Sequence, residues 1–370
     1  MITAINKSTI FTGEETLVEK TLLIEDGKIK AIVDSQEVPD DSNVIDLNNH
    51  FIAPGLIDLQ IYGAGGYLFA GTPTTKALQQ MELQLLSEGC TGFLATVGTN
   101  TPQIVEQAID SSKSYRKDAI GNFLGLHLEG PYLNAKRKGA HPADLIKKAT
   151  LEEVKSWVER AEGEIKMITI APELQDQEVI DYLRSQDIVI SAGHSDANFE
   201  QAMEFFSGKV SAATHIFNAM PQLHHRDPGL VAAIFKQKPY TSVVADGIHV
   251  SFPMVELAKR ELGDKLFYIT DAVTETNEGV YQHVLKSDRY VMPDGTLSGS
   301  CLSMLQAVKN GINHVGISLE ESLRMASTYP ATAINRQHDL GFIKPGAQAN
   351  LIIFDQEHNF KSTMLAGIMS

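Results

Sequence analysis

Three side chains that suit a divalent cation stand at the ends of apolar runs in this sequence. Glu129 ends the run in GLHLEGPYLNAKRKGAH, and His194 and His215 end the runs in SAGHS and AATHIFNAM. A carboxylate at the dry end of a strand is unfavourable unless a cation or a hydrogen-bond donor meets it. One carboxylate and two imidazoles are a common ligand set for a divalent metal. We therefore predict that Glu129, His194 and His215 bind a metal ion.

A fourth polar residue, Asp271 in YITDAV, ends another apolar run. A hydrolytic metal site needs a base beside the bound water, whose pKa the metal lowers toward about 7. A nearby carboxylate can accept that proton, and we predict this role for Asp271. The alternative is structural, because an aspartate at a strand-to-helix turn often caps the helix.

The elements that must position these residues are eight short apolar runs, which alternate with amphipathic stretches such as LEEVKSWVERAE. Strand-then-helix repetition is typical of a parallel sheet, and eight repeats close a TIM-like (β/α)8 barrel. Active sites of such barrels form at the carboxyl ends of the strands, where the polar residues occur. The runs are LIDLQIYG, TGFLATVG, NFLGLHLEG, KMITIAPE, IVISAGHS, SAATHIFNA, TSVVADGIH and LFYITDAV.

The two ends of the chain have the pattern of short strands. TLLIEDGKIKAIV is two apolar alternations joined at Asp26-Gly27, which indicates a β-hairpin. The last segment, GFIKPGAQANLIIFDQEHNFKSTMLAG, also predicts strands with turns. We predict an α/β fold in which residues 1–53 and 340–370 form one small β-sandwich domain beside a barrel of residues 54–339. Two unrelated β tails are the alternative.

Composition narrows the classes of function. The 370 residues carry 31 Lys and Arg against 46 Asp and Glu, a net charge of −15, which disfavours binding to nucleic-acid phosphates. The two cysteines, Cys90 and Cys301, are widely separated and form no disulfide framework. The N-terminus lacks the pattern of a signal peptide, and no apolar stretch approaches the roughly 20 residues of a membrane helix. We expect a cytoplasmic protein with no nucleic-acid or membrane partner.

Seven motifs follow one another within residues 53 to 300: APGLIDLQIYGAGG, HLEGPYLNAKRKGAH, SAGHSDA, THIFNAMPQLHHRDPGL, ADGIHV, ITDA and LSGS. In this order they resemble the motif series of the N-acetylglucosamine-6-phosphate deacetylase family, which belongs to the amidohydrolase superfamily. Any one motif is weak evidence, whereas the ordered set is specific. The flanking β segments also fit, so the resemblance covers almost the whole chain.

The resemblance implies catalytic roles for matching residues. Glu129, His194 and His215 match the family's metal ligands. Asp271 matches the residue that deprotonates the hydrolytic water and later protonates the leaving amine. His141, in KGAH, matches the histidine that polarises the acetyl carbonyl and stabilises the oxyanion.

The resemblance also implies substrate contacts. Asn218 and Ala219, in FNAM, match groups that approach the sugar phosphate. His249 and Arg226 match the remaining phosphate contacts, and a guanidinium suits phosphate because it binds bidentately. In the family this arginine reaches in from a neighbouring subunit, so the resemblance implies a homodimer.

One departure from the wider superfamily concerns the number of metal ions. Many amidohydrolases carry His-x-His at the end of the first strand, where this chain has Gln60-Ile61-Tyr62. The fourth strand ends on no lysine, since Lys166 stands at its entrance. We therefore predict one divalent metal ion per subunit, namely zinc, which mixed nitrogen and oxygen ligands suit. Iron(II), cobalt(II) and manganese(II) fit the same ligands.

The remaining histidines and a basic stretch receive structural interpretations. His127 lies on the same strand face as Glu129, so we favour a hydrogen-bonded interior role over ligation. His224 and His225 lie in a polar loop that can rim the site. Lys136, Arg137 and Lys138 are interpreted as a solvated loop that can attract an anion. The residues interpreted as scattered on the surface are His50, His283, His314, His338 and His358.

These observations predict a metal-dependent hydrolase. It removes the N-acetyl group of N-acetylglucosamine 6-phosphate, giving glucosamine 6-phosphate and acetate in amino-sugar catabolism. The same chemistry on N-acetylgalactosamine 6-phosphate is one alternative. A cyclic-amide hydrolase is disfavoured because the His-x-His pair and the lysine are missing. A non-catalytic, amidohydrolase-like assembly protein is disfavoured because the ligands and the base are all present.

Overall fold

Eight parallel strands form the barrel of the computed structural model, which describes residues 1–276 and 279–369. They are β6 (Leu56–Ile61), β9 (Cys90–Gly98), β10 (Phe123–Glu129), β11 (Ile165–Ile170), β12 (Val189–Ala192), β13 (Ala212–Ala213), β14 (Tyr240–Val243) and β15 (Leu266–Tyr268). Each lies within or overlaps one of the predicted apolar runs, and neighbours follow chain order. A parallel bridge between Ile61 and Ala272 joins β6 to the segment after β15. The predicted (β/α)8 barrel is therefore confirmed.

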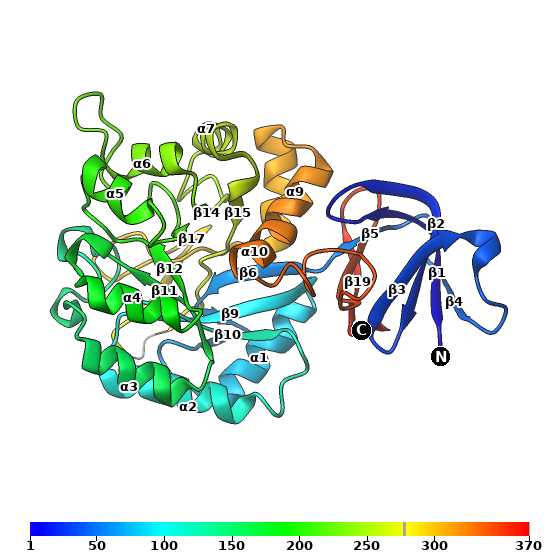
Figure 1. Ribbon diagram of the computed structural model, residues 1–370, viewed down its shortest axis with the longest axis horizontal. Coiled ribbons are helices and arrows are strands. Elements are labelled where there is room, and N and C mark those ends of the chain that lie inside the picture. The colour runs from blue at the N-terminus through cyan, green and yellow to red at the C-terminus, as the bar shows by residue number, and fades with distance from the viewer. Residues whose placement is uncertain (277–278, 370) are drawn as a thin grey trace.

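A helix follows each barrel strand, and the helices surround the sheet (Figure 1). They are α1 (Thr75–Leu86), α2 (Pro102–Tyr115), α3 (Leu151–Ala161), α4 (Gln177–Ser185), α5 (Phe199–Phe206), α6 (Gly229–Gln237), α7 (Phe252–Leu262) and α8 (Met304–Asn310), followed by α9 (Leu319–Ala326) and α10 (Thr328–Ala333). Helix α3 illustrates the local rules. The Thr150 hydroxyl accepts from the Glu153 N–H at its start, and Val154, Trp157 and Ala161 form its buried stripe.

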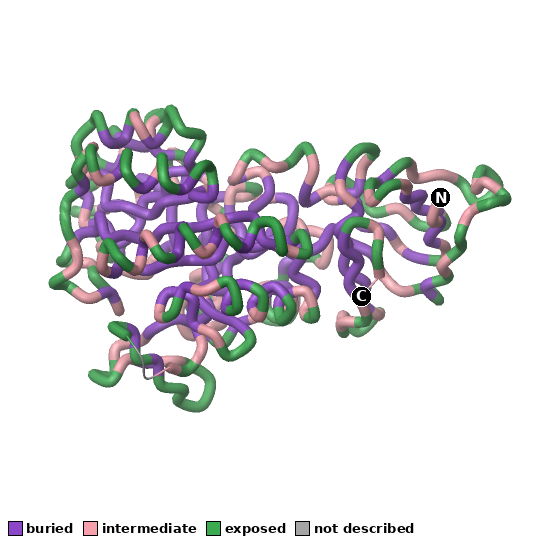
Figure 2. The backbone as a smooth tube through the Cα atoms, turned by 90° about the horizontal axis from the view of Figure 1, so that it is seen from below, coloured by how far each residue is buried: buried purple, intermediate pink, exposed green. Residues whose placement is uncertain are grey.

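Almost all residues of the barrel strands are buried, in the interior that Figure 2 shows in purple. One fully buried histidine, His127, lies in this interior. Its Nδ1 donates to the Leu59 carbonyl at 2.9 Å, and its Nε2 accepts from the Thr169 hydroxyl at 2.8 Å. Burial lowers the pKa of His127 to about 3. The predicted interior, hydrogen-bonded role of His127 is confirmed.

The two ends of the chain share a second sheet, seen at the right of Figure 1. Its strands are β1 (Thr3–Phe11), β2 (Thr16–Glu25), β3 (Lys28–Asp34), β4 (Asn43–Asp46), β5 (Phe51–Pro54), β18 (Leu351–Phe354), β19 (Phe360–Leu365) and β20 (Ile368–Met369). Strands β5 and β18 pair antiparallel over four residues each, so the chain ends are not unrelated tails. Asp26 and Gly27 both have positive φ, as a two-residue hairpin turn requires. The division at residues 53/54 and 339/340 stays a prediction.

The strand β1 makes this sheet continuous. Its first half pairs with β4 and its second half with β5. The buried side chains of both halves meet in one cluster that includes Ile5, Leu22, Ile52, Leu351 and Met364. The small core is thus built from both the first and the last parts of the sequence.

Between β15 and α8 the chain crosses the mouth of the barrel instead of entering a helix directly. This segment contains the hairpin of β16 (Val284–Lys286) and β17 (Arg289–Val291), and a second short hairpin, β7 (Gly63–Ala64) with β8 (Tyr67–Leu68), follows β6. Tyr281 and Val273 pack with Tyr62, Leu68 and Ala70 in a separate apolar cluster. None of the helices in the described parts of the chain has the length and apolar character needed to span a membrane.

Candidate active site

The carboxyl ends of the barrel strands surround one pocket, and most of the predicted site residues line it. Those that do are Glu129, His141, His194, His215, Asn218, Ala219, His249 and Asp271. The pocket also contains Tyr62, Tyr281, His283 and Ser298. Arg226 is exposed and does not line the pocket of its own subunit.

The three predicted metal ligands converge within hydrogen-bonding distance of one another. The Glu129 Oε1 atom lies 3.0 Å from His215 Nε2 and 3.3 Å from His194 Nε2. The two Nε2 atoms are 3.2 Å apart. Glu129 ends β10, whereas His194 and His215 follow β12 and β13 with positive φ of 47° and 34°, an unfavourable conformation typical of functional sites.

A hydrogen bond of His194 shows which of its ring nitrogens carries the proton and which offers a lone pair to the cluster. Its Nδ1 lies 2.7 Å from the carbonyl oxygen of Arg137, and because a carbonyl only accepts, Nδ1 carries the proton. The Nε2 atom therefore presents a lone pair toward Glu129, as a metal-binding imidazole does. An anionic oxygen and this lone pair together fit a divalent cation.

The loop that supplies this carbonyl is exposed at Lys136 and Lys138, as interpreted from the sequence, and it also forms ion pairs. Asp196 accepts from Arg137 Nε at 2.8 Å and from Lys136 Nζ at 3.3 Å. Glu173, at the end of the neighbouring strand, accepts from Asn134 at 3.0 Å. The Arg137 ion pair thus helps to hold the loop whose carbonyl binds His194.

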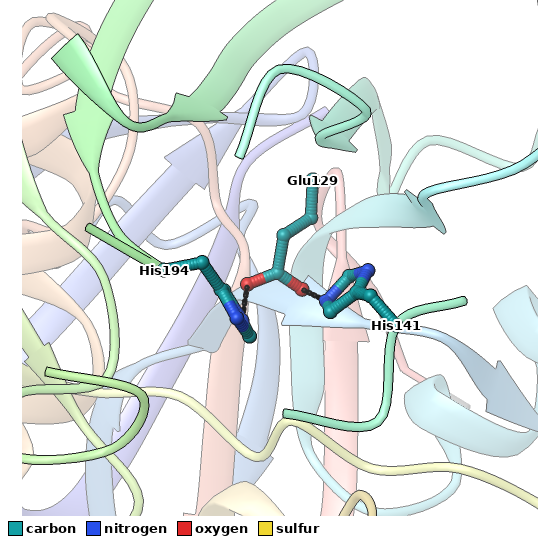
Figure 3. Close-up of side chains that lie close together, drawn as sticks. All are labelled: Glu129, His141 and His194. Atoms are coloured by element: carbon teal, nitrogen blue, oxygen red, sulfur yellow. Dashed lines mark ion pairs between the residues drawn. The ribbon is translucent and has the colours of Figure 1, made fainter. Parts of the chain in front are cut away.

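His141 also approaches the cluster. Figure 3 shows it on the opposite side of the Glu129 carboxylate from His194. Its Nε2 lies 3.6 Å from Glu129 Oε2, and ligand atoms of Glu129, His141 and His194 all lie within 4.8 Å of one another. Burial alone would raise the pKa of Glu129, but the surrounding imidazoles of His141, His194 and His215 hold it well below its usual value. Glu129 is therefore the anionic centre of the site.

Asp271 approaches from the β15 side, where Gln60 joins it to the cluster. The amide nitrogen of Gln60 donates to Glu129 Oε2 at 3.1 Å and to Asp271 Oδ1 at 3.2 Å. Burial and the negative charge of Glu129 raise the pKa of Asp271 to about 7. No helix of the described chain begins at Asp271, because α8 starts at Met304 after its own cap, Ser303. The alternative role as a helix cap is therefore wrong.

His249 is a cationic group in the pocket wall. Its Nδ1 lies 2.6 Å from the Asp246 carboxylate and its Nε2 lies 2.6 Å from the Ser298 carbonyl. Both partners are acceptors, so both nitrogens donate and the ring is an imidazolium. Burial opposes this charge, but Asp246 raises the pKa of His249 above its usual value.

Among the pocket residues that were not predicted as part of the site, three polar ones share one segment of the chain. Tyr281, His283 and Ser298 come from the segment that crosses the barrel mouth. The interpretation of His283 as a surface residue is wrong, because only 4% of it is exposed and its Nδ1 lies 2.7 Å from the Ser298 hydroxyl. The motif LSGS marks Ser298, but no periodic pattern marks Tyr281 or His283.

A (β/α)8 barrel with a carboxylate–imidazole cluster at its carboxyl end defines a metal-dependent hydrolase of the amidohydrolase type. The chain belongs to the amidohydrolase family, whose model matches residues 51–369. Residues 4–52 match a second model, described as NagA composite domain.

Similar proteins narrow the class. An N-acetylglucosamine-6-phosphate deacetylase of Haemophilus influenzae is 30% identical, over 97% of this chain and 96% of its own. One from Danio rerio is 32% identical, over 94% and 91%. The crystal structure of the Pasteurella multocida enzyme of the same name superposes with a TM-score of 0.95 at 32% identity, covering both chains fully. Among amidohydrolases, this chain therefore belongs with the N-acetylglucosamine-6-phosphate deacetylases.

Proposed function

We propose that this protein hydrolyses the N-acetyl group of N-acetylglucosamine 6-phosphate, producing glucosamine 6-phosphate and acetate in amino-sugar catabolism. The observation that carries the proposal is the meeting of Glu129, His194 and His215 with Asp271 in one pocket. Relatives that bear the name of this activity match almost the full length of the chain, which supports the same substrate here. The location expected from the sequence, the cytoplasm, stays a prediction.

Glu129, His194 and His215 are the proposed ligands of one divalent ion, with zinc as the first choice and iron(II), cobalt(II) or manganese(II) as alternatives. When bound, such an ion supplies Lewis acidity and lowers the pKa of water. Gln60 stands where related enzymes place ligands for a second ion. Its amide hydrogens point at Glu129 and Asp271, an arrangement that supports the prediction of a single metal.

Asp271 is the proposed proton carrier. Gln60 binds Oδ1, which leaves Oδ2 as the atom that takes a proton from the attacking water. After the tetrahedral intermediate forms, the same oxygen returns the proton to the amine nitrogen, and the carbon–nitrogen bond breaks. His141 is the proposed donor to the acyl oxygen as negative charge develops there.

The proposed binding place of the sugar phosphate is the part of the pocket wall that contains Asn218, Ala219 and His249. Asn218 and Ala219 form one part of this wall, and the His249 imidazolium adds positive charge. His249 Nε2 already donates to Ser298, so it acts on the phosphate by charge or exchanges that hydrogen bond for it. Arg226 does not line the pocket of its own subunit. This supports a homodimer in which Arg226 of each subunit reaches the pocket of the other.

The decisive experiment is acetate release from N-acetylglucosamine 6-phosphate, N-acetylgalactosamine 6-phosphate and N-acetylglucosamine, combined with metal analysis of the purified protein. We expect the highest kcat/KM for the first sugar and one metal ion per subunit. A higher kcat/KM for N-acetylgalactosamine 6-phosphate would identify that sugar as the substrate instead. No acetate release from any of the three by the metal-loaded protein would refute the proposal.

A further inference from the structure

We propose that Tyr281 is a positioning residue which, through the backbone of Thr99, holds His141 with its proton on Nε2. In this form His141 donates a hydrogen bond to the acyl oxygen and is not a metal ligand. The inference rests on the proposed function, because it assigns how one residue of that site is oriented. The residues involved come from three places: the end of β9, the loop after β10 and the segment over the barrel mouth.

The protonation pattern of His141 follows from one hydrogen bond. The backbone N–H of Thr99 donates to His141 Nδ1 at 3.2 Å. Since a backbone N–H can only donate, Nδ1 must offer a lone pair, and the neutral ring carries its proton on Nε2. That Nε2 lies at the pocket, 3.6 Å from Glu129 Oε2. The ring therefore presents a donor to the reacting group.

Tyr281 fixes the backbone that makes this bond. Its hydroxyl donates to the Thr99 carbonyl at 2.8 Å and lies 3.2 Å from His141 Nδ1. Tyr281 is 5% exposed, and burial, with a contribution from Glu129, raises the pKa of its phenol well above the usual value. The phenol therefore remains a donor. It binds the carbonyl of Thr99, while the N–H of the same residue donates to His141.

The strand end is shaped to admit this phenol. A Cβ atom on Gly98 would lie 2.7 Å from the Tyr281 hydroxyl, closer than real Cβ contacts allow. Gly98 has no positive φ, so the close approach of Tyr281 explains the glycine better than backbone conformation does. Gly98 and Tyr281 form a matched contact between the barrel and the segment above it.

Distance alone would make His141 a metal ligand, since its ligand atom lies in the same group as those of Glu129 and His194. Its hydrogen bond argues against this, because a protonated Nε2 has no lone pair to offer. His194 has the opposite pattern, with Nδ1 protonated by its bond to the Arg137 carbonyl. Two neighbouring imidazoles are thus set by their backbone partners to opposite roles.

The test uses the full-length, zinc-loaded protein with ¹⁵N-labelled histidine. Nuclear magnetic resonance distinguishes protonated from unprotonated ring nitrogens, and H141N identifies the His141 signals. We expect wild-type His141 to carry its proton on Nε2, with no zinc coordination at that ring. In Y281F we expect a mixture of the two neutral forms, with kcat about 10-fold lower, KM within about 2-fold and zinc content unchanged.

Two further variants separate positioning from general stability. G98A keeps the Tyr281 hydroxyl but forces it from Thr99, so it should reproduce the Y281F spectrum and its loss of kcat. Y290F removes a hydroxyl from the same segment and should leave both unchanged. A wild-type His141 protonated on Nδ1, a zinc-bound His141, or an unaltered His141 spectrum in Y281F would overturn the inference. Because the spectra require no turnover, they remain decisive even if N-acetylglucosamine 6-phosphate is not hydrolysed.

Discussion

The pocket has two parts that differ in origin and in chemistry. We call the residues at strand ends, Glu129, His194, His215 and Asp271, the floor, and residues 279–300 the roof. In the floor, an anion, a second carboxyl group and imidazole nitrogens lie within hydrogen-bonding distance or are linked by one amide. In the roof, polar groups meet matched partners, as the hydroxyl of Tyr281 does at the Thr99 carbonyl.

The difference extends to the backbone. His194, His215 and Asp271 have positive φ of 47°, 34° and 53°, and each such residue costs roughly 1–3 kcal/mol. The floor therefore has an unfavourable backbone conformation, and its buried Asp271 is also repelled by Glu129, a repulsion that a cation would relieve. The comparison teaches that reactive groups are concentrated in the floor, whereas the roof orients them and closes the pocket.

The largest effect should follow from neutralising the centre of the floor. E129Q keeps the shape of the side chain but removes the anionic ligand, so we expect loss of bound metal and a fall in kcat of at least about 10³-fold, since catalysis depends on the ion. Metal analysis and acetate release measure both. The control is E178Q on the exposed face of α4, which should retain metal. Full metal content in E129Q would show that the floor is not organised around Glu129.

A smaller loss should follow from removing the base while keeping the ligands. D271N preserves the contact with Gln60, so metal content should remain, while kcat falls about 10²–10⁴-fold because general acid–base catalysis is worth that much. Steady-state kinetics and metal analysis separate this variant from E129Q. A near-normal kcat in D271N would remove Asp271 from its proposed role and leave the floor with a purely metal-binding function.

The same division explains what could be predicted from the sequence. Floor residues end apolar runs, and the carboxyl ends of parallel strands meet at one rim, so local patterns suffice to place Glu129, His194, His215 and Asp271 together. The barrel itself was predictable because eight strand and helix repeats follow one another. The pairing of chain ends in the small sheet was predictable from turn signals and strand patterns alone.

Roof residues have no such local signal. Tyr281 and His283 lie in a loop without periodicity, and their burial depends on where that loop crosses the barrel. His283 was therefore interpreted as a surface residue. Arg137 was missed for a related reason, since its backbone carbonyl, and not its charge, orients His194. Backbone groups carry no residue identity, so a sequence cannot show which of them will accept a particular hydrogen bond.

The third effect concerns Arg226, which belongs neither to the floor nor to the roof of its own subunit. R226A should raise KM for the phosphorylated sugar about 10–100-fold, the value of one charged hydrogen-bonding group, and change the unphosphorylated sugar little. R289A, on the exposed roof hairpin, is the control. If both sugars suffer equally, Arg226 does not contact the phosphate.

Mixing R226A with D271N, assayed at a substrate concentration below the wild-type KM where both variants are impaired, tests the proposed crossing between subunits. In a hybrid of R226A and D271N subunits, one site combines an intact Asp271 with the partner's Arg226. If the subunits of an equal mixture reassort at random, half of the dimers are hybrids and each hybrid has one complete site. The mixture should therefore recover about a quarter of wild-type activity. Activity that stays at the level of the separate variants would place Arg226 in its own subunit's site and remove the need for a dimer in catalysis.

The smallest effect is the pH dependence of stability in metal-free protein, for which Asp271 of the floor and His283 of the roof should have opposite signs. The pKa of Asp271 rises to about 7 on folding, so between about pH 4 and pH 7 the folded state holds a proton that the unfolded state has released, and stability falls as pH rises. The pKa of His283 falls to about 4 because burial disfavours its charge. From about pH 6.5 down to pH 4 the unfolded state binds the extra proton, so this contribution is lost as pH falls.

Denaturant unfolding of chelator-treated protein at pH 5 and pH 8 separates the two contributions. D271N should gain stability over wild type at pH 8, on the order of 1–3 kcal/mol, and should differ less at pH 5. H283Q should show its relative gain at pH 5 instead. Asp58, whose pKa burial also raises to about 7, remains in both variants and contributes equally to each. If D271N gains no stability at pH 8, the floor is not electrostatically unfavourable without its ion, and metal binding then adds stability without relieving any repulsion.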